Sequence, residues 1–376
     1  VDRTELSTSQ YTYRSDNGAI VIKGTAIKGD IVITAAGTAN SYTVTLDMQG
    51  GSGGTPSVVA TYDSTMPSIV KPARTGYTFS GYFTLPDGNG TAYYDSDLTA
   101  LKPYDFASDT TLYAFWTANT YTVIYDSNKP VSASGMVEGT MQSTLHTYDS
   151  GSTLRENGYR LDGWTFQGWS TEKNGQVEYA DGEEIFTLSK EEGSLITLYA
   201  VWQANTYNVT YDSNKPVLAS GTIEGTMPDT VHIYDTGSLL KENGYRLEGW
   251  TFQGWSTEKN GQVEYADGAE VFTLSEHEGS SVTLYAVWKA NTYTVTLNSM
   301  GGTAYGSVYA VFDSSMPAIT LPNKQGYLFQ GYYSEKGGQG LSYYDAEGNS
   351  LTTYAVSGDI MLYAWWEPVT YTIQFY

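Results

Sequence analysis

"GWTFQGWSTEKNGQVEYADG" occupies residues 163–182 and recurs unchanged at residues 249–268, 86 positions further along the chain. Tyr, Trp, Val and Thr favour strands, whereas Gly, Asn and Asp mark turns. The dipeptide Asn174-Gly175 fits a type I′ turn, in which both central residues need positive φ. The stretch therefore predicts a β-hairpin that has been copied as a piece of structure, without any need for chemistry.

The copied hairpin lies inside a longer period. A strand-like opening recurs as "NSYTVTLD" at Asn40, "NTYTVIYD" at Asn119, "NTYNVTYD" at Asn205 and "NTYTVTLN" at Asn291. A strand-like ending recurs as "TLYAFW", "TLYAVW", "TLYAVW" and "MLYAWW", which end at Trp116, Trp202, Trp288 and Trp366. Only two to four residues separate each ending from the next opening, so we expect consecutive repeats to be joined closely.

These landmarks predict six segments. They are residues 1–39, the C-terminal strands of a preceding β domain; repeat 1, 40–118; repeat 2, 119–204; repeat 3, 205–290; repeat 4, 291–368; and 369–376, the first strand of an incomplete fifth repeat. The strand signals in the first segment are "GAIVIKG" at 18–24 and "GDIVITAAG" at 29–37.

Composition supports a mostly β fold, α+β at most. The chain has 34 Tyr, 9 Trp and 40 Gly among 376 residues, and its helix formers never run long without Gly, Pro or Thr. The one helix that we expect is short and lies at "GSTLRENG", residues 151–158, with Ser152 as its N-cap and Gly158 as its stop.

Charge and cysteine content exclude several classes of protein. The net charge is −22, from 41 acidic and 19 basic residues, which argues against nucleic acid and against anionic lipid as partners. Repeats 2 and 3 each carry 12 acidic and 5 basic residues, so the charge is spread along the chain. The absence of Cys excludes disulfides and thiolate metal sites, and no apolar run approaches the ~20 residues of a membrane span.

Differences between repeats 2 and 3 predict which residues are buried. In the opening strand Thr122 and Ile124 change to polar residues, while Tyr121, Val123 and Tyr125 are kept one period later. Because strand side chains alternate between faces, the unchanged residues predict the core face.

The closing strand can be interpreted in the same way. Leu195 changes to Ser and is expected to be exposed, while Ile196, Leu198, Ala200 and Trp202 are expected in the core. Three further positions exchange only aliphatic residues, as packing tolerates, namely Val137/Ile223, Leu145/Val231 and Ile185/Val271.

A search for catalytic groups finds none that every repeat shares. His146 and His232 are equivalent, but the same column holds Ala60 and Ala310, so we interpret both histidines as strand surface residues. Paired carboxylates occur at Glu183-Glu184, Glu191-Glu192, Asp95 and Asp97, and they are interpreted as a solvated acidic face. We expect no catalytic, cofactor-binding or metal-binding residue.

Metal binding remains a minor alternative. "DSNK" has some features of a calcium loop, but it does not continue into a 12-residue EF-hand pattern. Weak calcium binding would involve Asp126, Asn128, Asp212 and Asn214.

The aromatic residues of the central motif have two interpretations. Trp164 and Trp169 correspond to Tyr77 and Tyr82 in repeat 1, and to Tyr327 and Tyr332 in repeat 4. Aromatic identity in every repeat favours a core role, while exposed aromatic rings would form a platform for sugars or protein partners.

Three motifs in order resemble the Listeria–Bacteroides repeat, the internalin B-repeat-like family of bacterial surface proteins. Repeat 1 carries them as "YTVTLD" (42–47) with Gly50-Gly51, "GYTFSGYF" (76–83) and "LYAFW" (112–116), and the resemblance covers residues 40–376. Repeats 2 and 3 depart from the pattern, because "SNKP" replaces Gly-Gly after the opening strand and a longer segment precedes "GWTFQGW".

The resemblance implies a small mixed sheet similar to a β-grasp unit, and no catalytic residues. It implies display on a bacterial cell surface, with this chain as part of a larger exported protein whose signal and anchor lie elsewhere. We therefore expect a non-catalytic extracellular region of stalk or adhesin repeats that forms an elongated monomeric rod.

Two other functions are kept open. One is a glycan- or protein-binding module that uses hairpin tips and exposed aromatics, and the other is the accessory region of a polysaccharide-degrading enzyme. Partners would be a host or bacterial surface protein or a glycan, with no nucleic acid and no membrane insertion.

Overall fold

The structure, a computed structural model, describes residues 6–16, 18–26, 37–303 and 306–374. Contacts divide the chain into two units, each described by itself: the first is the chain up to Thr120 with Thr147–Asp149 and Ser189–Gly193, and the second is the remainder. The described elements are strands and one 3-10 helix, η1 (Gly24–Ala26), which confirms the mostly β class. No helix in the described ranges has the length and apolarity needed to cross a membrane.

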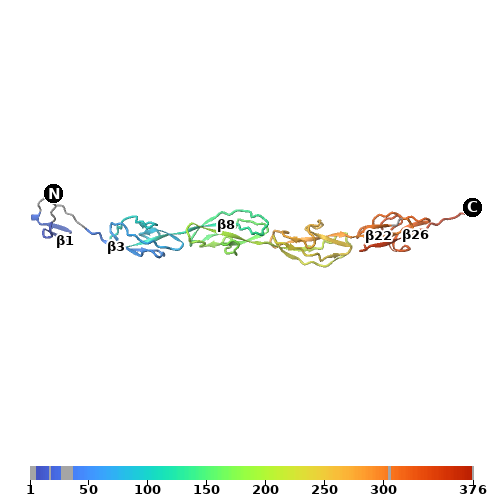
Figure 1. Ribbon diagram of the computed structural model, residues 1–376, viewed down its shortest axis with the longest axis horizontal. Helices are drawn as coiled ribbons and strands as arrows, with labels where there is room; N and C mark the ends of the chain where they lie inside the picture. Colours follow the sequence, from blue (N-terminus) through green and yellow to red (C-terminus); the bar gives the residue numbers. More distant parts are fainter. Residues whose placement is uncertain (1–5, 17, 27–36, 304–305, 375–376) are drawn as a thin grey trace. The chain divides into compact units, whose positions relative to one another are not determined.

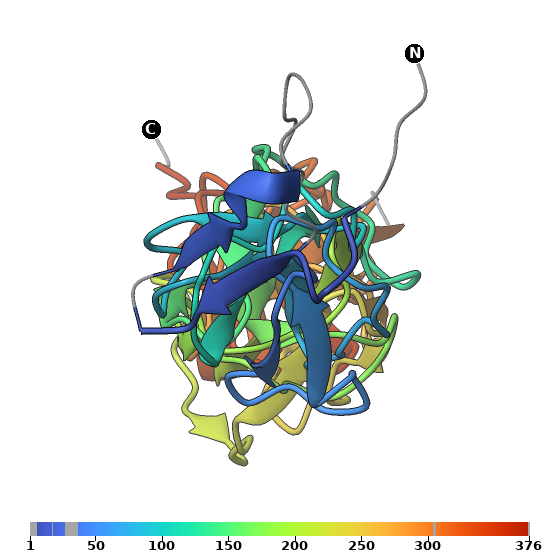
Figure 2. The same cartoon turned by 90° about the vertical axis from the view of Figure 1, so that its left-hand side faces the viewer.

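The first unit starts with a hairpin. Strands β1 (Tyr11–Arg14) and β2 (Ala19–Ile22) are antiparallel, and they are the dark blue arrows of Figure 2. Strand β2 confirms the strand signal at 18–24, whereas the signal at 29–37 lies outside the described residues except for Gly37. That this segment ends a preceding domain stays a prediction.

Repeat 1 forms one five-stranded sheet in the order β4-β3-β7-β5-β6 (β3 is labelled in Figure 1). Its strands are β3 (Ser41–Asp47), β4 (Ser57–Thr61), β5 (Tyr77–Phe83), β6 (Ala92–Tyr94) and β7 (Thr110–Ala118). The opening strand β3 and the closing strand β7 are parallel, and the other pairs are antiparallel. A parallel pair cannot be joined by a tight turn, and here the segment that contains β4, β5 and β6 makes the crossover.

Repeat 4, in the second unit, has the same topology, β23-β22-β26-β24-β25. Its strands are β22 (Thr292–Asn298), β23 (Gly306–Val311), β24 (Tyr327–Glu335), β25 (Gln339–Tyr344) and β26 (Ile360–Pro368). The opening strand β22 again runs parallel to the closing strand β26.

Repeats 2 and 3 keep the central strands and shorten the rest. In repeat 2 the strands are β8 (Thr120–Asp126), β9 (Thr144–Thr147), β10 (Ser152–Thr153), β11 (Trp164–Ser170), β12 (Glu184–Ile185) and β13 (Ser194–Ala204). In repeat 3 they are β14 (Thr206–Asp212), β15 (Ile223–Glu224), β16 (Thr230–Ile233), β17 (Ser238–Leu239), β18 (Arg246–Leu247), β19 (Trp250–Ser256), β20 (Glu270–Val271) and β21 (Ser280–Ala290). Each has a four-stranded mixed sheet, β11-β13-β8-β9 and β16-β14-β21-β19, beside short two-stranded ladders. Small mixed sheets confirm the expected tandem β repeats, while the detailed likeness to a β-grasp unit stays a prediction.

Each repeat has its own core cluster. In repeat 2, Tyr121, Val123 and Tyr125 are buried, as the in-chain comparison predicted. Leu198 and Ala200 are fully buried and Leu195 is 67% exposed, which confirms the alternation predicted for the closing strand.

The closing tryptophans are less buried than expected. Trp116 is 9% exposed, whereas Trp202, Trp288 and Trp366 are half-buried at the edge of their cores. Each indole nitrogen donates a hydrogen bond to a carbonyl just after the opening strand, as Trp202 does to Ser127 at 2.8 Å. These residues therefore tie the last strand to the first and do not fill the centre of the core.

Steric constraints explain why the second glycine of the central motif is a glycine. Gly168 has φ 146° at a register shift in strand β11, and a Cβ there would lie 2.6 Å from the carbonyl oxygen of Tyr179. Only glycine allows this bulge. The bend lets Trp169 lie fully buried, as do its equivalents Tyr82, Trp255 and Tyr332, so the core interpretation is confirmed for this column.

The helix predicted at 151–158 is wrong. Ser152–Thr153 form strand β10, which pairs with β12. The amide of Leu154 donates to the carbonyl of Glu183, and the amide of Arg155 donates to the hydroxyl of Tyr125. Leu154 is buried, with 2% of its surface exposed. A local helix would break both of these hydrogen bonds and bring Leu154 to the surface.

The type I′ turn predicted at Asn174-Gly175 is also wrong. Asn174 has φ 66°, but Gly175 is not among the residues with positive φ. The amide of Gly175 donates to the carbonyl of Glu172, so the turn spans 172–175 with Asn174 as its third residue. After the turn, a single bridge between Trp169 and Tyr179 replaces the expected second strand.

Two further expectations differ from the structure. Leu145 and Val231 exchange as aliphatic residues, yet they are 71% and 70% exposed, so that pair is not part of the core. Ile185 and Val271 are buried, as expected. Residues 369–374 are not in a strand, and among the described residues they have no closing strand of their own repeat to pair with.

Candidate functional site: the junctions between repeats

A single asparagine joins repeat 2 to repeat 3. Strand β13 ends at Ala204 and strand β14 begins at Thr206, so Asn205 is the whole linker. Its amide donates to the carbonyl of Gly163 in repeat 2 at 2.8 Å, and its carbonyl accepts from the amide of Tyr234 in repeat 3 at 2.9 Å. The backbone of the linker is therefore bonded to both repeats.

The side chain of Asn205 repeats this pattern. Its Oδ1 accepts from Thr165 Oγ1 of repeat 2 at 2.6 Å, and its Nδ2 donates to the carbonyl of Glu276 of repeat 3 at 2.7 Å. Asn205 is only 8% exposed. A short linker whose polar groups are bonded on both sides restrains the rotation of one repeat against the next.

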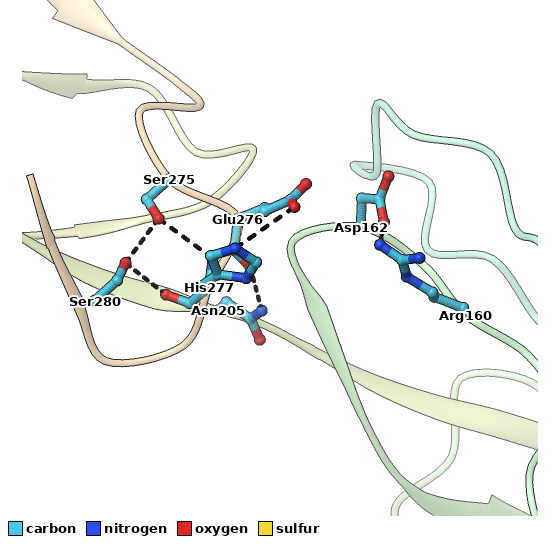
Figure 3. A network of polar contacts seen from close by, with 7 residues as sticks. All are labelled: Arg160, Asp162, Asn205, Ser275, Glu276, His277 and Ser280. Carbon is cyan, nitrogen blue, oxygen red and sulfur yellow. Dashed lines mark hydrogen bonds and ion pairs between the residues drawn. The ribbon is translucent and has the colours of Figure 1, made fainter. Parts of the chain in front are cut away.

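The loop that supplies the Glu276 carbonyl is itself held by hydrogen bonds (Figure 3). Ser275 Oγ lies 2.7 Å from Ser280 Oγ, and Ser280 Oγ donates to the carbonyl of His277 at 2.7 Å. On the repeat 2 side, Figure 3 shows the exposed ion pair of Arg160 with Asp162, at 2.9 Å. The loop therefore presents the Glu276 carbonyl to Asn205 in an ordered form.

The first glycine of the central motif lies against an aromatic ring of the next repeat. Gly163 has φ 74°, and a Cβ there would lie 2.1 Å from the ring of Tyr234. At the following junction Gly249 has φ 73° and meets the ring of Phe312 at 2.2 Å. Only glycine permits both the backbone conformation and this close approach.

The first aromatic residue of the motif donates to a carboxylate of the next repeat. Trp164 Nε1 donates to Asp235 Oδ2 at 2.9 Å. The same carboxylate accepts from Ser134 of repeat 2, from Oγ at 2.5 Å and from the backbone amide at 2.9 Å. We call this arrangement of Trp164, Ser134 and Asp235 the carboxylate clamp.

The clamp recurs between repeats 3 and 4. Trp250 Nε1 donates to Asp313 Oδ2 at 3.0 Å, and Ser220 donates to the same carboxylate from Oγ and from its amide. Trp250 also packs against the core cluster of repeat 4. The junction is thus an extension of the next repeat's core, which accounts for an aromatic residue at this position.

The hydrogen bonds of the clamp shift the acidity of its carboxylates. Partial desolvation raises the pKa of Asp235, but the bonds from Ser134 and Trp164 outweigh it and leave the pKa below its ordinary value. The pKa of Asp313 is lowered by the same balance. Both carboxylates are therefore held in the charged form that accepts three hydrogen bonds.

The first unit contains a simpler version. Asn119 donates to Gly76 at 2.9 Å and accepts from Tyr148 at 2.8 Å, and its Nδ2 donates to the carbonyl of Lys190 at 2.8 Å. The ring of Tyr148 lies over Gly76, as at the other junctions. The clamp is reduced to one longer bond, from the Tyr77 hydroxyl to Asp149 at 3.3 Å, and Asp149 is exposed.

In repeats 1 and 4 some of the corresponding residues are exposed. Gly326 has φ 77° with no atom within 4 Å of the position a Cβ would take, and Tyr327 is 41% exposed. In repeat 1, Tyr62 is 40% exposed and the neighbouring Asp63 has φ 60°. These residues are the equivalents of the ones that meet at the junctions.

The two equivalent histidines are not surface residues, so that prediction is wrong. His146 and His232 are 3% and 2% exposed. His146 stacks on Tyr121 and bonds through both ring nitrogens, to Thr144 and to Ser152, each at 2.7 Å. His232 stacks on Tyr207 and bonds through Nε2 to Thr230 at 2.9 Å, while its Nδ1 has no hydrogen-bond partner among the described residues. In repeats 1 and 4 the same column holds fully buried alanines.

The carboxylates considered for calcium or catalysis have local structural roles. Asp126 Oδ1 accepts from the amide of Asn128 at 2.7 Å, and Asp212 does the same for Asn214 at 2.6 Å. Asp95 Oδ1 accepts from the amides of Asp97 and Thr99. Among the residues that the structure describes, no three His, Asp or Glu side chains are grouped so that they could hold a metal ion.

Other acidic residues also bond within their repeat. Glu192 accepts from both the amide and the hydroxyl of Thr120, at 2.7 and 3.0 Å. Glu183 Oε2 accepts from the amide of Ala180 at 2.6 Å. These carboxylates therefore order turns and strand ends.

The junction residues were missed by sequence reasoning, although a signal was present. An aromatic residue followed by Asp recurs at 62–63, 148–149, 234–235 and 312–313, and the linker Asn recurs at 40, 119, 205 and 291. Trp164 and Trp250 were expected in the core of their own repeats, but they are half-buried and bond to the next repeat instead.

Fold and junctions together define a protein of tandem β repeats with specific contacts between neighbours. The chain belongs to the Listeria-Bacteroides repeat domain family, whose family model matches residues 42–115, 121–201, 207–287 and 293–365. These four matches fall in the four segments that carry the repeated sheet.

Two kinds of relative are similar to the chain. A putative Gly-rich membrane protein of Evansella cellulosilytica is 31% identical over 81% of this chain and 32% of its own length. Internalin H of Listeria monocytogenes is 28% identical over 53% of this chain and 31% of its own length. The chain thus spans about a third of the length of these relatives.

Proposed function

We propose that this chain is a non-catalytic, extracellular stalk region of a bacterial surface protein, in which the junctions hold successive repeats in a fixed arrangement. A flexible linker would let neighbouring repeats reorient freely. A linker of one residue, bonded on both sides and flanked by a ring and a carboxylate clamp, opposes that motion. This repeated junction is the observation that carries the proposal.

The relatives support a surface location. One carries the name of a Gly-rich membrane protein and another that of an internalin. In both, the region similar to this chain is a minor part of a longer protein. A spacer that projects other domains from the cell suits such a modular arrangement.

The acidic surface supports the same role. With a net charge of −22, like-charged repeats repel one another when they approach across solvent. Repulsion of this kind opposes folding back and association between copies. We therefore propose a monomeric, extended chain, with partners on the host or bacterial surface bound by other regions or by the site described below.

Small-angle X-ray scattering of the intact chain tests this proposal. Four repeats of roughly 30 Å each in a row would give a maximum dimension above about 120 Å. A single compact globule of this length would instead have a radius of gyration of about 21 Å. A distance distribution with a long tail, independent of protein concentration, supports the stalk, and a compact symmetric distribution overturns it.

A further inference from the structure

An open groove of ≈ 440 Å³ lies on repeat 2, between the turn after the opening strand and the turn of the duplicated stretch. Its lining includes five amide side chains and one indole, namely Asn128, Gln167, Asn174, Gln176, Gln203 and Trp202. No lining residue is charged, in a protein whose net charge is −22. This uncharged, amide-rich surface contrasts with the acidic composition of the chain.

The amides of the groove are available to a ligand. Asn128 uses its Nδ2 to bond the carbonyl of Ala200, which fixes its orientation. Gln167 donates from Nε2 to the carbonyl of Thr165 at 3.3 Å. The side chains of Asn174, Gln176 and Gln203 have no hydrogen-bond partner among the residues that the structure describes. Each free amide offers both donors and an acceptor on one rigid plane.

The indole completes the groove. Trp202 is half-buried and its Nε1 is already bonded to Ser127, so it offers the groove its ring and not its N–H. The "SNKP" that replaces Gly-Gly in repeats 2 and 3 supplies Ser127, Asn128 and Pro130, of which the last two line the groove. The groove therefore lies where these repeats depart from repeats 1 and 4.

The duplicated stretch contributes most of the amides. Repeats 2 and 3 differ at 20 of their 86 positions, yet residues 163–182, which hold Gln167, Asn174 and Gln176, are unchanged. Gln167 and Gln176 are exposed, so core packing does not explain their retention. Repeat 3 has the equivalent residues, with Lys289 in place of Gln203.

We propose that this groove binds neutral oligosaccharides. Sugar hydroxyls both donate and accept hydrogen bonds, as side-chain amides do, and the apolar face of a sugar ring packs on an indole. An uncharged lining gives no ion pair to a charged ligand. The site is independent of the stalk proposal, and the uncharged lining belongs to repeat 2, because Lys289 replaces Gln203 on the equivalent surface of repeat 3.

The test uses the intact chain and a panel of neutral oligosaccharides: cello-, xylo-, manno-, chito-, malto- and laminarihexaose. Tryptophan fluorescence and saturation-transfer NMR report binding. We expect at least one saccharide to bind saturably, and the double variant Gln176→Ala/Gln262→Ala to weaken its affinity about tenfold, as the loss of one good hydrogen bond per site predicts. Gln142→Ala, an exposed glutamine of repeat 2 outside the groove, is the matched control and should bind as the parent does.

Three results would overturn the proposal. The first is the absence of saturable binding across the panel. The second is unchanged affinity in the double variant, whose exposed substitutions should leave the melting temperature unaltered. The third is binding of acidic polysaccharides, such as polygalacturonate, at least as tight as that of every neutral saccharide.

Discussion

The indole nitrogen of Trp164 donates a hydrogen bond to the carboxylate of Asp235 at 2.9 Å, across the boundary between repeats 2 and 3. Ser134 donates two more hydrogen bonds to the same carboxylate. Charge-assisted bonds of this kind are worth about 1.5–3 kcal/mol each when they are lost. The boundary between repeats 2 and 3 thus contains three hydrogen bonds to one charged carboxylate.

Removing the carboxylate should loosen the junction and leave the cores intact. In Asp235→Ala, we expect the amide of Tyr234, which bonds the linker residue Asn205, to exchange its hydrogen about 10- to 100-fold faster. Amides of the core strand β8 should keep their protection. Hydrogen exchange followed by NMR measures both.

The matched control for this variant is Asp149→Ala. Asp149 is exposed, and its one side-chain hydrogen bond among the described residues comes from the Tyr77 hydroxyl at 3.3 Å. It should change exchange at Tyr148 by less than about threefold, since exposed single bonds contribute little. Equal effects of the two variants would mean that the clamp adds nothing to the junction.

Two glycines with the same backbone conformation allow two effects of a Gly→Ala substitution to be measured separately: overlap with an aromatic ring and strain in the backbone. Gly163 has φ 74° beneath the ring of Tyr234, whereas Gly326 has φ 77° with nothing within 4 Å of its Cβ position. Gly326→Ala should cost about 1–2 kcal/mol from the left-handed conformation alone. Gly163→Ala should cost clearly more, because the methyl group would overlap the ring.

Thermal unfolding of both variants, with chemical shifts of Tyr234 as a local probe, gives the comparison. The Tyr234 signals should move in Gly163→Ala and stay in place in Gly326→Ala. Equal losses of stability, with no movement at Tyr234, would show that the ring does not rest on this glycine in solution.

The clamp should release in acid. The folded-state pKa values of Asp235 and Asp313 are lowered, so the stabilisation is fully present above the ordinary value of about 3.9 and is lost as the pH falls through the lower folded value. The indole N–H signals of Trp164 and Trp250 should shift in that range and not between pH 5 and 7. In Asp235→Asn the signal of Trp164 should no longer titrate, while that of Trp250 still does.

A second pH dependence should appear within repeats 2 and 3, at higher pH. Burial lowers the pKa of His146 and of His232, so the folded state favours the neutral imidazole. Stability should be complete above the ordinary value of about 6.5 and should fall as the pH drops through the lower folded values.

Hydrogen exchange between pH 7.5 and 5 tests the histidine effect, after correction for intrinsic rates. Amides of strands β9 and β16 should lose protection as the pH falls. Amides of strand β23, where fully buried Ala310 occupies the same column, provide the internal control and should not change. Equal behaviour of the three strands would contradict the prediction.

Periodicity in the sequence predicted the features of the fold that repeat: the alternation of buried and exposed residues along a strand, and the recurrence of the strands from one repeat to the next. Exchange of Thr122 and Ile124 beside unchanged Tyr121 and Val123 predicted the core face, because a strand presents alternate residues to alternate sides. It could not predict that His146 is buried, since that depends on Ser152 and Thr144 coming within hydrogen-bonding distance of its ring. It also could not exclude the helix at 151–158, whose amides are bonded by residues distant in sequence.

The junctions were harder to predict for a related reason. Each repeat has an aromatic residue directly after Gly163 or its equivalent. When one repeat is considered alone, the simplest place for that aromatic side chain is the repeat's own core. Its true partner, an Asp about 70 residues later, becomes apparent only when the linker Asn205 has positioned the next repeat. Contacts between repeats therefore leave a repeated signal in the sequence but no local pattern.

The central claim is that the junctions hold consecutive repeats in one arrangement, and the distance between spin labels tests it most directly. The chain has no cysteine, so Leu195→Cys and Ser281→Cys place labels at the same exposed position of repeats 2 and 3 without further changes. Pulsed electron resonance should give one narrow distance distribution at neutral pH, which broadens when Asp235→Ala is added. A distribution that is already broad in the labelled parent, or that the added variant leaves unchanged, would contradict the account.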